Sequence, residues 1–515
     1  MLYLILFFIG DTTTAVGNFS SSLYFRSPSL NFMSLGYSNP ILATGVLGAV
    51  CNPAGLTDIK DKEFVLAGGI GTHSNLDWNP VIDMGEEVGE LELPLDISFA
   101  NPGGINFLGA GIKLKKIAIG IGFTDGMGFG SSMDGAGKIT YTFNDTIWDT
   151  LTSQDISELP AGTEVPVIWT YKTPVTTDLG LDGKMSYSER NFFLCLAGNF
   201  GPFEVGAGML HTPISGKANG SFGLNVNAPC SLECTPEYTG GWETDITGHT
   251  IINQKLVTGR GLTTLTGNEF SWLTGFQIKL GVLNLGASAS FTHPAVIKVS
   301  GDGSITHIAN APHIDSISYN PANVDVDTTN SHVQGEVDII LSPTSDTTEA
   351  DSFQESYKLP GRTGITMGSA LKVGPFTVGG AIGGAFSSFE MSFWSTLGLE
   401  SKLFFPLRAS LSAKMKGYRA SYFNSADSTG ADSTDSGGGL DFIPIPSAVL
   451  DIGSSFNIQK TTVYLGFRTN PLGLIMSIAS SFNKDMKDDM AEAGYGELPG
   501  LFSAFSPVFG VSIRF

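Results

Sequence analysis

The sequence predicts an all-β protein, a transmembrane antiparallel β-barrel whose lumen holds an N-terminal plug, or hatch. Three observations support this fold class. Apolar residues recur at every second position in many segments, which is the period of a strand and not of a helix. Charged residues make up only 15% of the chain, where ~25% is usual. Short turns alternate with much longer polar stretches, an asymmetry typical of outer-membrane barrels.

Composition limits the classes of function. Of the 515 residues, 65 are glycine, and 28 basic against 49 acidic residues give a formal net charge of −21. Affinity for nucleic acid comes largely from Lys and Arg, so we exclude nucleic acid as a partner. The shortage of charge indicates that much of the outer surface faces something other than water.

The N-terminus, MLYLILFFIGDTTTAVG, has the pattern of a secretory signal peptide. An apolar run precedes small and polar residues, and Thr13 with Ala15 suits a small-x-small cleavage site. The usual basic start is lacking and would lie upstream; a buried strand is the alternative. We expect residues 1–15 to be a signal peptide. No later apolar run reaches ~18 residues, so no transmembrane helix is expected.

Alternation dominates after residue 60. In KIAIGIGFT (116–124) Ile117, Ile119, Ile121 and Phe123 share one face, and small residues share the other. Four segments predict hairpins with tight turns: 108–123, 192–210, 275–291 and 368–384. The polar stretches between such units, at 125–183, 213–268, 293–360 and 424–446, are expected to be extracellular loops.

The strands of a soluble β-sandwich also alternate apolar and polar residues. The composition of the second strand face therefore distinguishes a sandwich from a membrane barrel. This face carries mostly Gly, Ala and Ser rather than the charged residues that water favours. This suits a narrow or filled lumen, with lipid on the apolar face and a closed sheet that leaves no unpaired edge. The chain ends in PVFGVSIRF, where Gly510, Ile513 and Phe515 have the spacing of the signal that outer-membrane barrels present to the barrel assembly machinery.

The segment before the barrel is too apolar for a linker. If the barrel begins at Glu63, residues 16–62 contain many large apolar side chains that need a hydrophobic environment. We expect them to form a plug inside the lumen, whose small wall residues leave room for it, with residues 63–515 forming the barrel. The turn at Asn52 and Pro53 is flanked by apolar residues, and the Asn52 amide can bond nearby main chain. An ordinary surface turn is the alternative.

This segment resembles the hatch of the FadL-type family, the outer-membrane transporters of long-chain fatty acids and other hydrophobic compounds. The resemblance is carried by LGYSNPILATGVLGAVCNPAGLTDI, in which Asn52, Pro53, Ala54, Gly55 and Leu56 match the hatch turn of the family. The acidic lead into the turn is missing here, and the rest of the chain matches by architecture only. The resemblance implies about fourteen strands and passive uptake of a hydrophobic ligand.

In this family a kink in the third strand often opens the barrel wall laterally. FANPGGINFLG contains the candidate break, at Pro102, Gly103 and Gly104, because proline removes a ladder donor and glycine weakens a strand. A plain hairpin turn is the alternative.

Several polar residues are candidates for binding. Lumen-side cations could hold the carboxylate of a ligand, or could instead pair with acids of the lumen or hatch; they are Arg190, Lys279, Arg408 and Lys414. Cys230 and Cys234 could form a disulfide after export, or ligate zinc, although no second pair or nearby His supports zinc. Cys195 is expected to be an apolar filler.

No catalytic motif, metal-binding spacing or cofactor motif is present, so we expect neither an enzyme nor a metal or cofactor protein. Three functions compete: a transporter for hydrophobic molecules or lipids, a FadL-like structural or shuttle barrel of a secretion system that binds partner proteins, and a porin for polar solutes. The apolar plug argues against the porin. The expected location is the outer membrane of a diderm bacterium, where the chain would act as a monomer.

Overall fold

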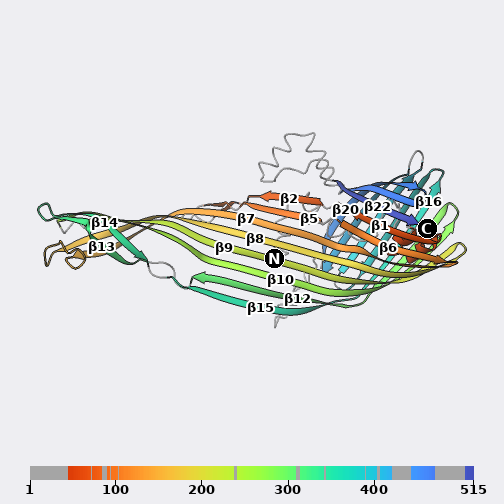
Figure 1. The fold of residues 1–515 in the computed structure, drawn as a ribbon, viewed down its shortest axis with the longest axis horizontal. Coiled ribbons are helices and arrows are strands. Elements are labelled where there is room, and N and C mark those ends of the chain that lie inside the picture. The colour runs from red at the N-terminus through yellow and green to blue at the C-terminus, as the bar shows by residue number, and fades with distance from the viewer. Residues whose placement is uncertain are drawn as a thin grey trace.

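The computed structural model has a closed barrel of 14 antiparallel strands (Figure 1). It describes residues 44–70, 72–79, 81–83, 90–92, 94–101, 104–236, 241–308, 314–341, 344–388, 390–402, 406–419, 442–469 and 505–515. The barrel strands, in order around the wall, are β1 (Lys62–Gly69), β6 (Gly104–Leu114), β7 (Ile117–Thr152), β8 (Glu164–Phe200), β9 (Phe203–Pro236), β10 (Glu243–Leu280), β11 (Leu283–Thr292), β16 (Arg362–Val373), β17 (Phe376–Phe386), β18 (Glu390–Ser401), β19 (Leu407–Arg419), β20 (Phe442–Ile458), β21 (Thr461–Thr469) and β22 (Phe505–Arg514).

The last strand closes the barrel against the first. Gly510 lies opposite Ala67 of β1 and Tyr464 of β21, and Ile513 lies opposite Phe64 and Thr461. The backbone N–H of Phe515 donates to the carbonyl of Lys62. Because both edges of β22 are paired, no strand edge of the barrel is left open here.

The four predicted hairpins are all present, each with a two-residue turn at the same end of the barrel. These turns join β6 to β7, β8 to β9, β10 to β11 and β16 to β17. Gly201, Gly281 and Gly374 begin three of them with φ between +59° and +77°, a conformation that glycine adopts without strain. We call this end the short-turn end.

The outer face of the barrel is apolar, as the alternation predicted. Ile121, Ile382 and Leu397 are 60%, 67% and 63% exposed, on three different strands. Their neighbours Gly122, Ala381 and Thr396 face inward and are half-buried or buried. A closed band of exposed apolar residues of this kind suits lipid and not water. No helix in the described part of the chain is long and apolar enough to cross a membrane.

The expectation of long loops at 125–183, 213–268 and 293–360 was wrong, because most of these residues form strands. β7, β8, β9 and β10 continue far beyond the barrel, and Figure 1 shows them running toward its left side. Shorter strands join them: β2 (Thr72–Trp78), β3 (Val81–Asp83), β4 (Glu90–Glu92), β5 (Leu95–Asn101), β12 (Ala295–Ile308), β13 (Ile314–Asp327), β14 (His332–Leu341) and β15 (Asp346–Leu359). Of the fourth stretch, 424–441 lies outside the described residues, and β20 begins at Phe442.

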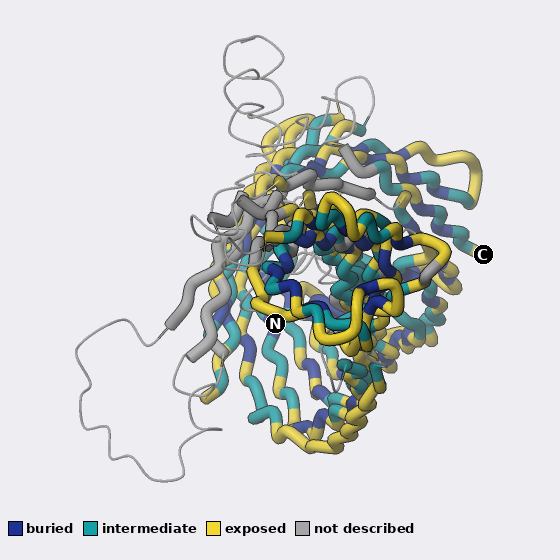
Figure 2. Tube along the Cα trace, turned by 90° about the vertical axis from the view of Figure 1, so that its left-hand side faces the viewer, coloured by how far each residue is buried: buried dark blue, intermediate teal, exposed yellow. Residues whose placement is uncertain are grey.

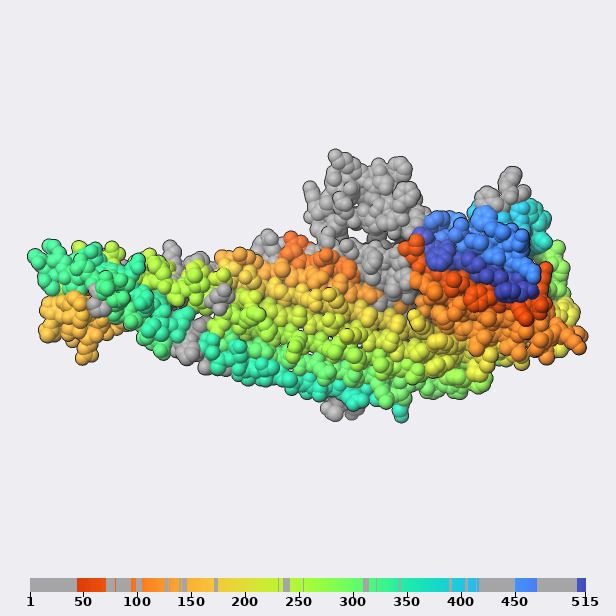
Figure 3. All heavy atoms as spheres, in the orientation of Figure 1, coloured from red at the N-terminus to blue at the C-terminus, as the bar shows by residue number. Residues whose placement is uncertain are grey.

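These strands form one open sheet, the projecting sheet, in the order β2, β5, β7, β8, β9, β10, β12, β15. Figure 3 shows that this sheet projects far beyond the barrel. The residues are polar, but neighbouring strands satisfy the backbone groups of the inner strands, and the edge strands β2 and β15 are paired on one side. Thr, Val and Ile also favour the extended conformation, so polarity here marks a water-facing strand and not a loop.

The far tip of the sheet has its own core. The β13–β14 hairpin pairs there, and β14 runs parallel to the start of β10. Trp169, Leu232 and Val333 are fully buried in this cluster, which is separate from the cluster at the barrel. Figure 2 looks onto this end and shows buried residues lining the inside of the tip and exposed residues outside.

The expected disulfide between Cys230 and Cys234 is absent, because Cys234 is a free, buried thiol. Both residues lie in β9, four positions apart. In a strand that separation is about 13 Å, whereas a disulfide needs Cα atoms within roughly 7 Å. Cys195 is buried against the main chain of Ala49, as expected of an apolar filler.

Candidate functional site

Residues 44–59, here called the inner segment, lie against the lumen face of the barrel wall. They contain a single helical turn, α4 (Gly45–Gly48), and a 3-10 helix, η2 (Pro53–Asp58). Val46, Leu56 and Ile59 are at most 2% exposed and belong to the barrel core. Residues 1–43, which include the predicted signal peptide and the first part of the predicted hatch, lie outside the described residues.

The side-chain amide of Asn52 fixes the Asn-Pro-Ala turn through hydrogen bonds made by both its oxygen and its nitrogen. Asn52 Oδ1 accepts the backbone N–H of Ala54 at 3.1 Å, and Asn52 Nδ2 donates to the carbonyl of Phe276 in β10 at 3.1 Å. Pro53 occupies the first position of η2, where no helical N–H is needed. Asn52 is fully buried. The alternative of an ordinary surface turn is therefore wrong.

Wall glycines leave the space that the inner segment fills. A Cβ atom at Gly111 would lie 2.5 Å from Ile59, one at Gly120 would lie 2.7 Å from Leu56, and one at Gly206 would lie 2.5 Å from the backbone of Pro53. One at Gly275 would meet the Asn52 side chain. Carbon atoms do not approach this closely without displacement. The small residues of the lumen face thus shape the wall around the inner segment, as predicted.

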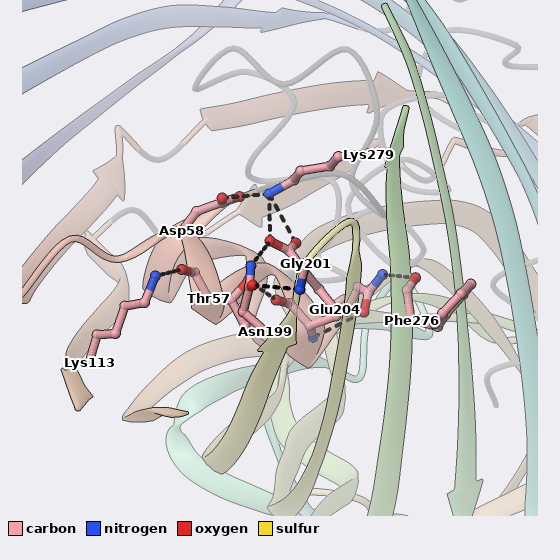
Figure 4. Close-up of polar contacts among 10 residues, drawn as sticks. Thr57, Asp58, Lys113, Asn199, Gly201, Glu204, Phe276 and Lys279 are labelled. Atoms are coloured by element: carbon pink, nitrogen blue, oxygen red, sulfur yellow. Dashed lines mark hydrogen bonds and ion pairs between the residues drawn. The ribbon is translucent and has the colours of Figure 1, made fainter. Parts of the chain in front are cut away.

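An ion cluster fixes the end of the inner segment to the wall (Figure 4). Lys279 Nζ of β10 lies 2.5 Å from Asp58 Oδ1 and 2.9 Å from Glu204 Oε2 of β9. The Glu204 side chain is 3% exposed, and Asn199 Nδ2 donates to its Oε1 at 3.0 Å. Burial raises the pKa of the Asp58 carboxyl, and Lys279 opposes that rise. Lys113 Nζ donates to the carbonyl of Thr57 at 2.5 Å.

A second contact ties the start of the inner segment to the closing strands. Glu63 of β1 accepts the backbone N–H of Val46 at 2.8 Å through Oε2. Its Oε1 accepts from Ser512 at 3.0 Å and from Arg514 at 3.1 Å, both in β22. The inner segment is thus held at one end by the carboxylate of Glu63 and at the other by the ammonium of Lys279.

Two of the four predicted lumen cations pair with protein acids, which was the alternative to ligand binding. Lys279 is in the ion cluster, and Arg408 lies 3.5 Å from Glu400. Arg190 is not in the lumen: it pairs with Asp125 at 3.5 Å and lies over the Phe123 ring, on the outer face. The alternation of β8 itself places it there, because Arg190 shares the outward face of the exposed Phe192 and Leu194. Lys414 lies in β19, and its side chain lies outside the described residues.

The predicted break joins two strands and is not a hairpin turn. β5 and β6 both pair with β7 in the antiparallel sense, so they run in one direction. Gly104 begins β6 with φ +138°, whereas Pro102 and Gly103 lie outside the described residues. The alternative of a hairpin turn is therefore wrong, and β6, which follows the predicted break, is the second strand of the barrel and not the third.

The pairing of the third barrel strand, β7, is irregular next to the start of β6. β7 has a register shift against β8 between Asp125 and Gly128. On its other side, the described pairing with β6 ends at Phe107 opposite Thr124, and pairing with β5 starts at Gly130. A bulge next to a change of partner weakens the ladder locally. The pairing of β7 is therefore irregular on both of its sides here.

The inner face of the projecting sheet continues the lumen face of the barrel and is largely apolar from β9 to β12, whereas on β15 it also carries Glu349, Asp351 and Glu355. Along β9, even positions keep one face from Gly206 to Leu224, because no register shift against β10 intervenes. The side chain of Phe222 lies across Gly259 of β10, and that of Phe353 lies across Gly301 of β12. The odd positions of β9, which face outward, include the polar residues Lys217, Asn219, Ser221 and Asn225.

Sequence reasoning missed this face, and it missed the partners of the ion cluster. The segment KANGSFGLNVNA (217–228) alternates polar and apolar residues strictly, which could have predicted a strand. Likewise, Glu204 alternates with Phe203 and Val205 and could have been placed in the lumen. Among the described side chains, no three His, Cys, Asp or Glu residues gather closely enough to hold a metal ion.

No model of a known protein family and no curated protein sequence matches the chain. Solved structures of similar fold include the Pseudomonas putida toluene transporter TodX, at 9% identity and TM-score 0.37, covering 94% of this chain and 97% of that one. The monoaromatic hydrocarbon channel CymD is 9% identical, with TM-score 0.32 and coverage of 96% and 98%. A Pseudomonas aeruginosa FadL homologue is 9% identical, with TM-score 0.28 and coverage of 96% and 98%. The chain is thus similar to transporters and channels, at identities below those that show a shared family.

Proposed function

We propose that this chain is an outer-membrane protein for the passive uptake of hydrophobic small molecules, of the FadL type that its hatch turn resembles. One observation carries the proposal: the inner face of β9 in the projecting sheet is apolar and leads to the buried inner segment. Exposed apolar surface of this extent marks a site of interaction. The apolar outer band of the barrel supports placement in lipid, with the short-turn end toward the periplasm.

In this mechanism the cargo moves by partition and not by chemistry. An apolar molecule leaves water for the inner face of the projecting sheet, where Phe222 and Phe353 are 40% and 47% exposed. It reaches the inner segment, residues 44–59 of a proposed hatch spanning 16–62, and passes when that segment shifts or when the wall opens beside the bulge in β7. Long-chain fatty acids and aromatic hydrocarbons are both candidates for the cargo.

The remaining assignments belong to the same proposal. Residues 1–15 direct export, residues 63–515 include the barrel, and the C-terminal strand presents Gly510, Ile513 and Phe515 to the barrel assembly machinery. The chain acts as a monomer in the outer membrane of a diderm bacterium, and it is not an enzyme.

Uptake into vesicles tests this function. The purified chain is inserted into phosphatidylcholine vesicles, and entry of a fluorescent fatty acid, of toluene and of glucose is followed against empty vesicles. We expect faster entry of one or both apolar molecules and no change for glucose. Equal acceleration of glucose would indicate a porin. No acceleration of any of them, together with specific capture of periplasmic proteins, would favour the shuttle barrel instead.

A further inference from the structure

Exposed lysines gather at the short-turn end, the right-hand end of Figure 3. They lie in the turns or within two residues of a barrel strand end: Lys60, Lys62, Lys115, Lys116, Lys372, Lys402 and Lys460. Asp61 is the only exposed acid in the described part of these turns and their flanks. The whole chain has a net charge of −21. At this end of an acidic protein, exposed lysines therefore outnumber exposed acids, and we call these lysines the lysine ring.

The other acids at this end are already neutralised. Glu204 pairs with Lys279, Glu63 with Arg514, and Glu400 with both Arg408 and Lys402. All three carboxylates are buried or half-buried. Apart from Lys402, which pairs with Glu400, no lysine of the ring forms an ion pair with a barrel carboxylate in the described part of the chain, so the lysine ring presents its charge outward.

The lysine ring lies at the border of the apolar outer band. Leu114 and Ile117, on either side of the first turn, are 57% and 50% exposed, and Val373 and Ile458 beside later turns are 59% and 62% exposed. If this band lies in lipid, the adjacent lysines lie at the level of the lipid headgroups. A lysine can keep its alkyl chain along apolar surface while its ammonium reaches a phosphate.

The distribution of the lysines favours lipid over a protein partner. They come from the ends of β1, β6, β16, β18 and β20, along the arc of the rim that runs from β16 through β22 to β6; the turns at Gly201 and Gly281 carry none. Lipid borders the whole of this arc, whereas one folded protein would cover only part of it. All are lysine and none arginine, which suits diffuse attraction to headgroups better than two-pronged recognition of a single group.

We propose that the lysine ring binds the phosphate groups of anionic phospholipids in the leaflet on the short-turn side. This inference rests on the membrane placement in the proposed function, but not on the cargo. Binding of such lipids fixes the depth of the barrel and holds the turns at the membrane surface.

Native mass spectrometry of the full chain tests the proposal. Detergent-purified protein is mixed with equal amounts of phosphatidylglycerol and phosphatidylcholine of matched chains. The test variant replaces Lys115, Lys116, Lys372, Lys402 and Lys460 with Gln. The control replaces five exposed lysines of the projecting sheet with Gln, which changes the net charge equally: Lys138, Lys184, Lys217, Lys298 and Lys358.

We expect the native chain and the control to retain phosphatidylglycerol several-fold over phosphatidylcholine, and the test variant to lose that preference. Added salt should weaken it. The proposal would be overturned if the native chain retained the two lipids equally, if the test variant kept the preference, or if the control lost it equally. Capture of an acidic protein without lipid preference would also overturn it.

If the fivefold variant does not fold, Lys372→Gln and Lys460→Gln are compared singly with Lys298→Gln. Vesicle uptake is measured separately, so loss of uptake with lipid preference intact would overturn only the proposed function.

Discussion

At the scale of single residues, the ion pair of Lys279 decides how firmly the inner segment is held. It bridges Asp58 of that segment and the buried Glu204 of the wall. Removing one partner of a buried pair leaves the other charge without compensation, which costs more than an exposed pair contributes. The inner segment is therefore tied to the barrel by charge as well as by packing.

We expect Lys279→Met to destabilise the chain by roughly 2 kcal/mol, a value discounted for the partial exposure of Lys279. Hydrogen exchange at residues 46–57 should speed up, and uptake of apolar cargo should rise, because the inner segment shifts more easily. Lys298→Met, on the outer face of β12, is the control. Unchanged exchange in the Lys279 variant would show that packing alone holds the segment.

The wall glycines give a second test at this scale. Gly275→Ala places a methyl group against Asn52, whereas Gly261→Ala in the same strand meets no atom within 4 Å. Overpacking of this kind costs about 1–3 kcal/mol. We expect chemical unfolding in detergent to show that loss for Gly275→Ala alone. Equal stability of the two variants would mean that the inner segment moves aside without cost.

At the scale of elements, the last strand has two roles that can be separated. β22 closes the barrel by pairing on both edges, whereas the Phe515 side chain is 63% exposed and contributes little packing. We expect Phe515→Ser to lower the amount of folded barrel in the outer membrane several-fold, with the Tm of the purified variant unchanged. Ile458→Ser, at 62% exposure on the outer face of β20, is the control. If both variants assemble normally, the C-terminal residue is not a signal.

The two faces of β9 in the projecting sheet also make separable predictions. Phe222→Ser removes an apolar side chain from the inner face, and Asn219→Ser changes a nearby residue of the outer face. We expect only the first to slow uptake of apolar cargo into vesicles, by about two- to tenfold, since one large apolar side chain contributes 1.5–3 kcal/mol when fully buried and Phe222 is partly exposed. Equal uptake rates for the two variants would show that the cargo does not move along the inner face.

At the scale of the whole molecule, two separate cores imply two unfolding units. The barrel core includes Phe107 and the inner segment, and the tip core surrounds Trp169. Cooperative units with little shared packing open independently. In rising denaturant we expect hydrogen exchange at 165–169 and 333–339 to reach completion before exchange at 107–121. A single transition for all of these peptides would show that the long strands couple the two cores.

The sequence by itself determined the barrel, its hairpins and the buried turn. Period-two alternation and turn residues are local signals, so Ile117 to Phe123 and the turn at Asn52 could be predicted from their neighbours alone. The tertiary structure decided what depends on distant partners. Polar stretches became strands because neighbouring strands satisfied their backbones, and Lys279 became an anchor because folding placed Asp58 beside it.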